Sequence, residues 1–494
     1  MLWEWRREVS KFKAQERWLE PLWKPQGKIG WALVYPNYYS VGISNLGFLM
    51  VYRMLAEMKD IFVSRFFKWD GFTPLSFEEG RSLQEFEVIA FSLSYELDLI
   101  NLISILKKAG IPPLRGDRVD RFPVVGVGGI FPTMNPRPLF PIADFIFCGE
   151  SEESLSEMAE VFLSCWGLSK DKVLERLADL DGVLVPGVKD ITRRRWVMNL
   201  DRYALSAPLY TPLNQFGGAL LIELNRGCKR GCLFCPVRQC YNPFRFRSFE
   251  GLKSFLEEIP RGVKVGLISP VATDYPFFDE LLDYLLETGR KVSFGSFRVE
   301  GISEKLLLLL KQSDQKLLTL APETANEDLR RRIGKAFSND LLKEKISLAY
   351  RYGFRRVKLY FMVGLPGESL KDVEEINSLV REIKSEFKGL EVIVSVNPFV
   401  PKPFTPFEGE SFLSIPELVN RLKIIRKIAG VDVRGEGIKK AWLEAIISRG
   451  DEKLGETLSI LGDGAFSPKV LEEHLDVKIY LSGEIKPWRE SLKS

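Results

Sequence analysis

The sequence contains a single histidine, His474, among its 494 residues. Catalysis that depends on histidine, such as a His-ligated zinc site or a Ser-His-Asp triad, therefore has almost no residues to draw on. Long apolar runs are also missing, since Leu306–Leu310 is flanked by Lys305 and Lys311. The N-terminus has no apolar signal core. From these absences we expect a cytoplasmic protein with no membrane partner.

Cysteine is scarce as well, and its distribution is uneven. Four of the six cysteines lie between Cys228 and Cys240, a pattern that indicates a metal site in a reducing compartment and not a disulfide framework. The net charge of +4 is small for this length, so nucleic-acid binding is neither demanded nor excluded.

The motif Cys-x3-Cys-x2-Cys, formed by Cys228, Cys232 and Cys235, is the most informative stretch. Three thiolates this close can hold one soft metal centre, and in an iron–sulfur cube they leave one iron open for a small molecule. The preceding Ala219–Asn225 predicts a buried parallel strand, so the motif begins at a strand's carboxyl end. The alternative is zinc, with Cys240 as a fourth ligand.

This stretch resembles the cluster loop of the radical SAM superfamily. The resemblance implies a [4Fe–4S] cluster on the three cysteines, S-adenosylmethionine (SAM) at the open iron, and reduced ferredoxin or flavodoxin as electron donor. Ala321–Glu323, Lys358–Pro366 and Asn397–Phe407 resemble, more narrowly, uncharacterised radical SAM proteins with an N-terminal cobalamin-binding-like domain.

Alternating strand and helix patterns predict an α/β protein. Residues 1–190 predict a Rossmann-like, doubly wound sheet, and 191–216 a linker. Residues 217–410 contain six predicted strands, which resemble the partial (β/α)6 barrel of the radical SAM core. Residues 411–494 predict a helical C-terminal extension that we expect to cap the barrel.

The resemblance also implies a set of cofactor-binding residues at the barrel strand ends, while the catalytic residues stay unidentified. The SAM-contacting candidates are Ser269, Asp274, Ser296, Arg298, Glu323, Gly364, Gly367 and Glu368. For Glu323 the alternative is an acid favoured at a helix start. The basic residues Arg238, Arg245 and Arg247 form either a phosphate- or cofactor-binding patch or a solvated face.

The N-terminal domain departs from cobalamin-binding domains at one position. The loops Asn37–Gly42, Ser92–Ser94 and Gly126–Gly129 stand where such domains carry their ligand loops. Tyr39 replaces the cobalt-ligating histidine, and Asn37 replaces the aspartate that orients it, which rules out histidine-ligated cobalamin here. Three alternatives stay open: cobalamin without that ligand, a different ligand, or a scaffold that binds nothing.

We therefore expect a radical SAM enzyme that activates a C–H bond, with C- or P-methylation if cobalamin binds. Methylthiotransferases share the core, but this chain lacks the three N-terminal cysteines of their auxiliary cluster. Two further alternatives are an iron–sulfur or redox-sensing protein without SAM cleavage, and an enzyme that modifies RNA or the ribosome.

Overall fold

The computed structural model describes residues 2–22, 26–119, 123–295, 297–428, 430–462 and 467–493. By its contacts the chain divides into two compact units. The first comprises Met1–Leu221, Ile446–Tyr480 and Glu484–Ser494, and the second comprises Ile222–Ala445 and Leu481–Gly483. No helix in the described ranges is long and apolar enough to cross a bilayer.

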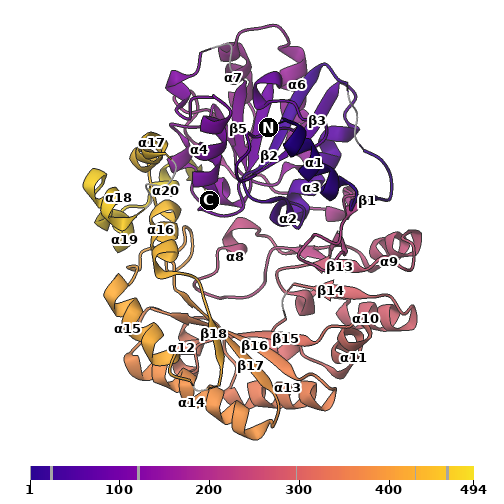
Figure 1. Cartoon of the computed structure of the whole chain (residues 1–494), viewed down its shortest axis with the longest axis vertical. Coiled ribbons are helices and arrows are strands. Elements are labelled where there is room, and N and C mark those ends of the chain that lie inside the picture. Colours follow the sequence, from indigo (N-terminus) through magenta and orange to yellow (C-terminus); the bar gives the residue numbers. More distant parts are fainter. Residues whose placement is uncertain are drawn as a thin grey trace. The chain divides into compact units, whose positions relative to one another are not determined.

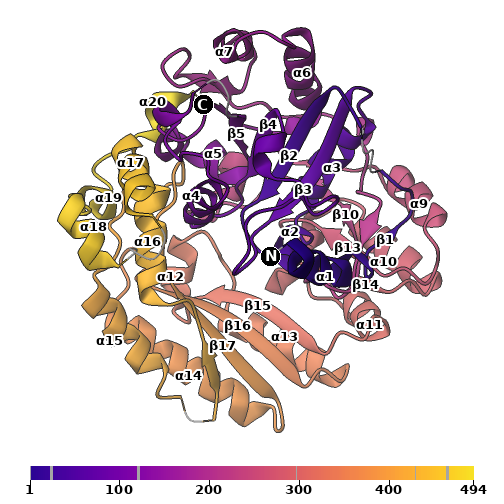
Figure 2. The same cartoon turned by 45° about the horizontal axis from the view of Figure 1, so that its top comes forward.

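The first unit is built on a six-stranded sheet in the order β3-β2-β4-β5-β6-β7. Its strands are β2 (Ile29–Tyr35), β3 (Ile61–Phe67), β4 (Val88–Ser92), β5 (Val124–Gly128), β6 (Phe145–Phe147) and β7 (Val183–Leu184). All neighbouring pairs are parallel except β6 and β7. Figure 2 shows β2 to β5 side by side. The chain reverses direction across the sheet between β2 and β4, which makes this the topological switch point.

Local sequence explains these elements. All seven residues of β2 and of β3 are buried, as expected for parallel strands covered on both faces. The helices are α1 (Leu2–Lys13), α2 (Tyr39–Gly42), α3 (Leu46–Glu57), α4 (Asp98–Lys108), α5 (Ile130–Met134), α6 (Ser151–Ser164) and α7 (Lys170–Ala178). Helix α4 begins with an acid and ends with two lysines, which matches the helix dipole.

Residues near the C-terminus complete the first unit. They form α17 (Glu452–Leu461), α18 (Pro468–His474), α19 (Lys478–Ser482), α20 (Trp488–Ser491) and β19 (Leu492–Lys493). Strand β19 pairs in parallel with β8 (Thr192–Arg193), and β1 (Arg17–Trp18) pairs with β9 (Leu209–Tyr210). A Cβ on Gly455 would lie 2.0 Å from Pro138 O. Residues 446–480 and 484–494 of this helical region therefore belong to the first unit, and residues 411–445 to the barrel unit that the whole region was expected to cap.

The second unit is the partial barrel (Figure 1). Its parallel strands form two runs, β10-β13-β14 and β15-β16-β17-β18. They are β10 (Leu220–Glu223), β13 (Val265–Ile268), β14 (Val292–Phe294), β15 (Leu317–Glu323), β16 (Arg356–Val363), β17 (Glu391–Pro398) and β18 (Asp432–Arg434). The six expected barrel strands are confirmed, and β18 adds a seventh beside β17.

Helices follow the barrel strands along the chain. They are α8 (Val237–Cys240), α9 (Phe249–Glu258), α10 (Phe278–Glu287), α11 (Glu304–Gln312), α12 (Glu327–Arg332), α13 (Asn339–Arg351), α14 (Leu370–Glu386), α15 (Ile415–Ile425) and α16 (Ile438–Ser448). Figure 1 shows α13 and α14 along the same side of the β15–β18 sheet. A capping box between Ser369 and Asp372 starts α14.

Candidate functional site

The three motif cysteines lie on the loop 227–236, between the short strand β11 (Asn225–Arg226) and α8. Gly227 opens the loop with φ of +81°, and a Cβ there would lie 2.4 Å from Tyr241 O. Both the backbone angle and this close approach require glycine. Strand β11 pairs with β12 (Arg245–Phe246), which ties the start of the loop to the segment that follows it.

The segment Ile333–Lys335, between α12 and α13, holds the cluster loop from the other side, and we call it the brace segment. Leu233 N donates to Ile333 O at 3.0 Å. Gly334 has φ of +84°, and a Cβ there would lie 2.2 Å from Gly231 O. The conformation of the cluster loop therefore depends on a glycine contributed by a distant part of the barrel.

The three thiols are suited to binding metal. Cys228, Cys232 and Cys235 are partly exposed, whereas Cys240 is buried. Burial raises the pKa of Cys228 and raises that of Cys235 to about 11, with smaller contributions from the neighbouring motif thiols. Binding therefore has to displace protons from these thiols.

The donor set also matches the expected group. Among the described residues, no three His, Cys, Asp or Glu side chains gather closely enough to hold a single metal ion. In a [4Fe–4S] cube each thiolate binds its own iron, so three partly exposed thiols on one loop fit this group.

An apolar contact seats the loop on the barrel. Phe234, between the second and third cysteines, packs against a buried cluster together with Met362 of β16 and Phe407. The cluster consists of Leu329, Ile333, Leu365 and Phe399. Met362 of β16 and Phe234 of the cluster loop therefore pack on one and the same buried cluster.

Two of the three arginines after the motif are buried, whereas Arg238 is exposed. Arg247 is buried and pairs with Glu223 at 2.8 Å, and Arg245 is buried and donates to the carbonyls of Tyr241 and Pro243. Burial alone would raise the pKa of Glu223, but Arg226 and Arg247 lower it below its usual value. Burial therefore corrects the expectation of a solvated face for Arg245 and Arg247, whereas the exposed Arg238 is compatible with it.

Two of the expected SAM-contacting residues are connected to the cluster loop. Ser269 Oγ donates to Asn225 Oδ1 at 2.6 Å, just before the loop. The Nδ2 group of Asn225 is buried without a hydrogen-bond partner. Asp274 accepts from Arg230 Nε at 2.9 Å, within the loop itself. A buried amide with an unused donor beside the thiols is the kind of group that a bound ligand satisfies.

Glu323 lies at the end of β15 in a strained conformation. Its φ is +65°, a region that side chains other than glycine rarely adopt. Lys335 of the brace segment donates to Glu323 Oε1 at 2.5 Å and to Ala321 O at 2.8 Å. Burial raises the pKa of Glu323, and the charge of Lys335 opposes that rise. Strain of this kind concentrates at functional sites.

The remaining expected residues form a separate group or stand apart. Glu368 accepts from Gly364 N at 2.7 Å and pairs with Arg421 at 2.8 Å, so it closes its own loop. Gly367 and Gly364 both have positive φ. Arg298 pairs with Glu300, and Ser296 lies outside the described residues. The brace segment was missed by sequence reasoning, although Gly334 directly after an arginine-rich helix end is a signal for a helix C-terminus.

In the first unit, Tyr39 is a core residue. Its hydroxyl donates to Glu16 at 2.8 Å, and its ring stacks on Phe77 with centroids 5.1 Å apart. Glu16 also pairs with the buried Arg65 at 2.8 Å. Burial raises the pKa of the Tyr39 hydroxyl above its usual value. This position does not fit a cobalt ligand.

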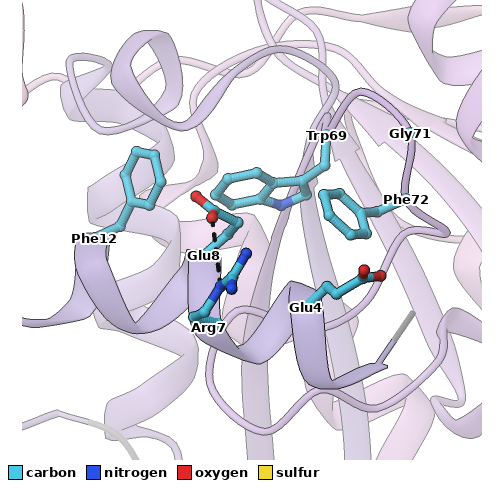
Figure 3. Close-up of a pocket in the computed structure, with 7 residues that line it drawn as sticks. All are labelled: Glu4, Arg7, Glu8, Phe12, Trp69, Gly71 and Phe72. Carbon is cyan, nitrogen blue, oxygen red and sulfur yellow. Dashed lines mark ion pairs between the residues drawn. The ribbon is translucent and has the colours of Figure 1, made fainter.

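Figure 3 shows a surface pocket between α1 and the loop after β3. It is lined by Glu4, Arg7, Glu8, Phe12, Trp69, Gly71 and Phe72. Glu8 is already paired with Lys11 at 2.7 Å and with Arg7 at 4.0 Å, so its charge is balanced. None of the expected site residues lines this pocket.

Comparison with known proteins agrees with this geometry. Residues 47–186 match the family model described as "Radical SAM proteins, N-terminal", and residues 222–380 match the model of the "Radical SAM superfamily". Fold, cysteine loop and matches together define a radical SAM enzyme. The chain belongs to the radical SAM superfamily, whose members use SAM and a [4Fe–4S] cluster.

One relative matches nearly the whole chain. The uncharacterized protein MJ0966 of Methanocaldococcus jannaschii is 33% identical over 440 residues, which cover 86% of this chain and 90% of that protein. The ribosomal protein uS12 methylthiotransferase RimO of Leptospira biflexa is 26% identical over 230 residues, 42% of this chain and 47% of that enzyme.

A solved structure shares the fold. The cobalamin-dependent radical SAM enzyme OxsB, solved with aqua-cobalamin and SAM bound, superposes with a TM-score of 0.51 at 14% identity. The match covers 81% of this chain and 56% of the OxsB chain. At this identity the likeness shows the fold alone.

Proposed function

We propose that this chain cleaves SAM reductively at a [4Fe–4S] cluster held by Cys228, Cys232 and Cys235, and uses the product radical to activate a substrate C–H bond. When bound, such a cluster supplies one electron that breaks a C–S bond of SAM, giving methionine and a 5′-deoxyadenosyl radical. That radical takes a hydrogen atom from the substrate and becomes 5′-deoxyadenosine. Three partly exposed thiols on one braced loop at a strand end carry the proposal.

The chain's own residues would bind and orient SAM beside this loop. Glu323, fixed by Lys335, presents a buried carboxylate that suits a cationic or hydroxyl group of SAM. Asn225 Nδ2 supplies an unused donor. Ser269 and Asp274 support the cluster loop through Asn225 and Arg230, and Ser296 and Arg298 complete the expected set.

The glycine loop after β16 would shape a second part of the SAM site. Gly364 and Gly367 allow the backbone to approach a flat ring closely, and Glu368 keeps the loop closed. Burial raises the pKa of Glu368 to about 7, although Gly364 N and Arg421 favour its charged form. Through its bonds with Gly364 N and Arg421, Glu368 would hold the shape of this loop.

Cobalamin-dependent methylation is the second candidate, because the fold resembles that of a cobalamin-dependent enzyme. Tyr39 supplies no cobalt ligand, so no step is assigned to cobalamin. Methylthiotransfer, the activity named for RimO, finds little support outside the motif. Cys148 and Cys165 are buried, and Cys148 Sγ lies 3.4 Å from Pro132 O, inside the core.

The test is anaerobic reconstitution with iron and sulfide, reduction with dithionite, and measurement of 5′-deoxyadenosine formed from SAM. We expect wild-type protein to bind iron and sulfide in equal amounts and to form 5′-deoxyadenosine. Cys232→Ala should lose both, because removing one of three thiolates leaves the cube under-ligated. Parallel samples with added cobalamin decide whether it co-elutes with the protein.

Cys240→Ala is the matched control, since Cys240 is buried and sits just beyond the motif. It should keep both cluster and cleavage. Zinc in place of iron, bound by wild type and lost in both Cys232→Ala and Cys240→Ala, would overturn the proposal. A cluster that forms in wild type and never cleaves SAM, with any donor, would favour a redox-sensing protein.

A further inference from the structure

Strand β16 has one buried face and one half-exposed face. Val357, Leu359, Phe361 and Val363 are buried, while the alternating residues Lys358, Tyr360 and Met362 are half-buried. Strands in the middle of a parallel sheet are normally buried on both sides. The half-exposed row is therefore a part of the barrel that the protein's own side chains do not fill.

The half-exposed row of β16 reaches the cluster loop through Met362. Met362 packs with Phe234 of that loop against the same buried cluster. Side chains two residues apart on a strand share a face, so Tyr360 and Lys358 lie on the face of Met362. At about 3.3 Å per residue, Tyr360 lies about 7 Å and Lys358 about 13 Å further down the strand. Both are within the reach of a small molecule whose other end lies near the cluster loop.

Lys358 and Tyr360 form a pair with unused donors. Lys358 Nζ donates to Tyr360 Oη at 2.8 Å and lies 4.5 Å from the centre of its ring. No ion pair within the described part of the chain includes Lys358. An ammonium group has three N–H donors, and the phenol keeps its own O–H when its oxygen accepts. Within the described residues, two N–H groups of Lys358 and the O–H of Tyr360 therefore have no hydrogen-bond partner.

The residues directly beside Lys358 on the two neighbouring strands are neutral. The acid of β15, Glu323, lies beside Phe361 and is paired with Lys335. By register Lys358 lies beside Thr319 of β15 and Ile393 of β17, and Tyr360 lies beside Ser395. A half-buried lysine without a carboxylate among neutral neighbours attracts an anion more strongly than a fully solvated lysine does.

We propose that Lys358 and Tyr360 bind an anionic group of the substrate, a carboxylate or a phosphate, and so set the end of the substrate that lies away from the radical. This rests on the proposed function, because it assigns the substrate class of the same barrel. The ammonium supplies charge, and the phenol O–H fixes the direction of the bound oxygen.

The test is protection of Lys358 from acetylation by an amine-reactive ester, followed by peptide mass spectrometry on the reconstituted full-length protein. Inorganic phosphate and acetate are compared with chloride at equal ionic strength. At ten times the dissociation constant of the anion, the acetylation rate should fall about tenfold. Phosphate alone protecting would indicate a phosphorylated substrate, and acetate alone a carboxylic acid.

Lys253 is the matched control. It lies 5.7 Å from the ring of Tyr284 but on the exposed side of α9, so its acetylation should not respond to either anion. Tyr360→Phe keeps the lysine and removes one donor, and should raise the anion concentration needed for protection about tenfold. Equal protection of Lys358 and Lys253, or no protection of either, would overturn the anion site.

SAM cleavage measured in the same samples separates the two proposals. Cleavage without protection of Lys358 would remove the anion site and leave the proposed function intact. Protection without cleavage would keep the anion site and count against the proposed function.

Discussion

Both units present the carboxyl ends of parallel strands, but they use these edges differently. In the first unit the edge at the switch point is closed by the chain itself: Asn37 Nδ2 donates to Asp98 at 2.9 Å, and Asn45 Nδ2 donates to Ser94 at 2.9 Å. In the second unit the edge carries partly exposed thiols and an amide donor without a partner. Among the described residues, the partly exposed thiols and the amide donor of the second edge are groups that a ligand would satisfy.

The difference shows why the topology alone does not assign a ligand. Open α/β sheets bind ligands at the switch point, and the order β3-β2-β4-β5-β6 is of the flavodoxin type. Here Gly129 has φ of +111°, and a Cβ added to it would lie 2.4 Å from Leu93 O. The glycine turn therefore packs on the neighbouring loop. Glycine at such a turn is required by the protein's own backbone and does not by itself indicate a cofactor.

The largest effect that would sharpen this comparison concerns the brace segment. Gly334→Ala adds a Cβ at positive φ and 2.2 Å from Gly231 O. The positive φ and the close contact together should destabilise the brace segment by about 3 kcal/mol. A left-handed residue other than glycine costs about 1 kcal/mol, and overpacking adds about 2 kcal/mol. We expect reconstituted protein to lose iron at a much lower urea concentration, followed by the visible absorbance of the cluster.

Gly389→Ala is the control for this variant. Gly389 has φ of +77° but nothing lies within 4 Å of an added Cβ. It carries the backbone cost without the clash, so iron should be retained nearly as in wild type. Equal iron loss in the two variants would mean that the brace segment does not hold the cluster loop.

The sequence predicts the strands and the cysteine loop well, because both depend on local pattern. Buried apolar runs such as β2 and β16 and the spacing of the cysteines are visible within a few residues. Strand β3 was missed although all seven of its residues are buried. It contains Arg65, whose partners Glu16 and Glu78 lie elsewhere in the chain, and a charged residue inside an apolar run hides a strand.

The same limit applies to the site. The resemblance indicates Glu323, but its partner Lys335 and the contact of Gly334 with the cluster loop depend on how α12 and α13 are joined. The pair of Lys358 and Tyr360 is local, two residues apart on one strand, so the alternation of β16 places both side chains on one face. The sequence does not show that the residues beside Lys358 are neutral. Only the register of the three strands shows this.

A smaller effect is expected at the closed edge of the first unit. Burial raises the pKa of Asp98 to about 6, although hydrogen bonds from Asn37 and Asn101 lower it in part. Because the folded pKa exceeds the unfolded value of about 3.9, protonation favours folding. The contribution of protonated Asp98 to the free energy of unfolding is complete below about pH 3.9 and is lost as the pH rises through about 6.

Asp98→Asn removes the buried charge and keeps an oxygen that accepts from Asn37. At pH 8 it should raise the free energy of unfolding by about 2 kcal/mol, and at pH 5 the gain should shrink to about half of that. Urea titrations at the two pH values, with fluorescence as the probe, measure this difference. A gain that is independent of pH would contradict burial of the charged carboxylate as its cause.

The smallest effect concerns Tyr39, at the position that separates the two interpretations of the first unit. Tyr39→Phe keeps the ring stacked on Phe77 and removes the hydrogen bond to Glu16, whose carboxylate still pairs with Arg65. We expect a loss of about 1 kcal/mol in the free energy of unfolding. Iron content and SAM cleavage should match wild type, because the Tyr39 hydroxyl already donates to Glu16 inside the core. If the variant instead folds as well as wild type but loses SAM cleavage or changes its retention of added cobalamin, Tyr39 contacts a ligand, and the first edge is as open to cofactors as the second.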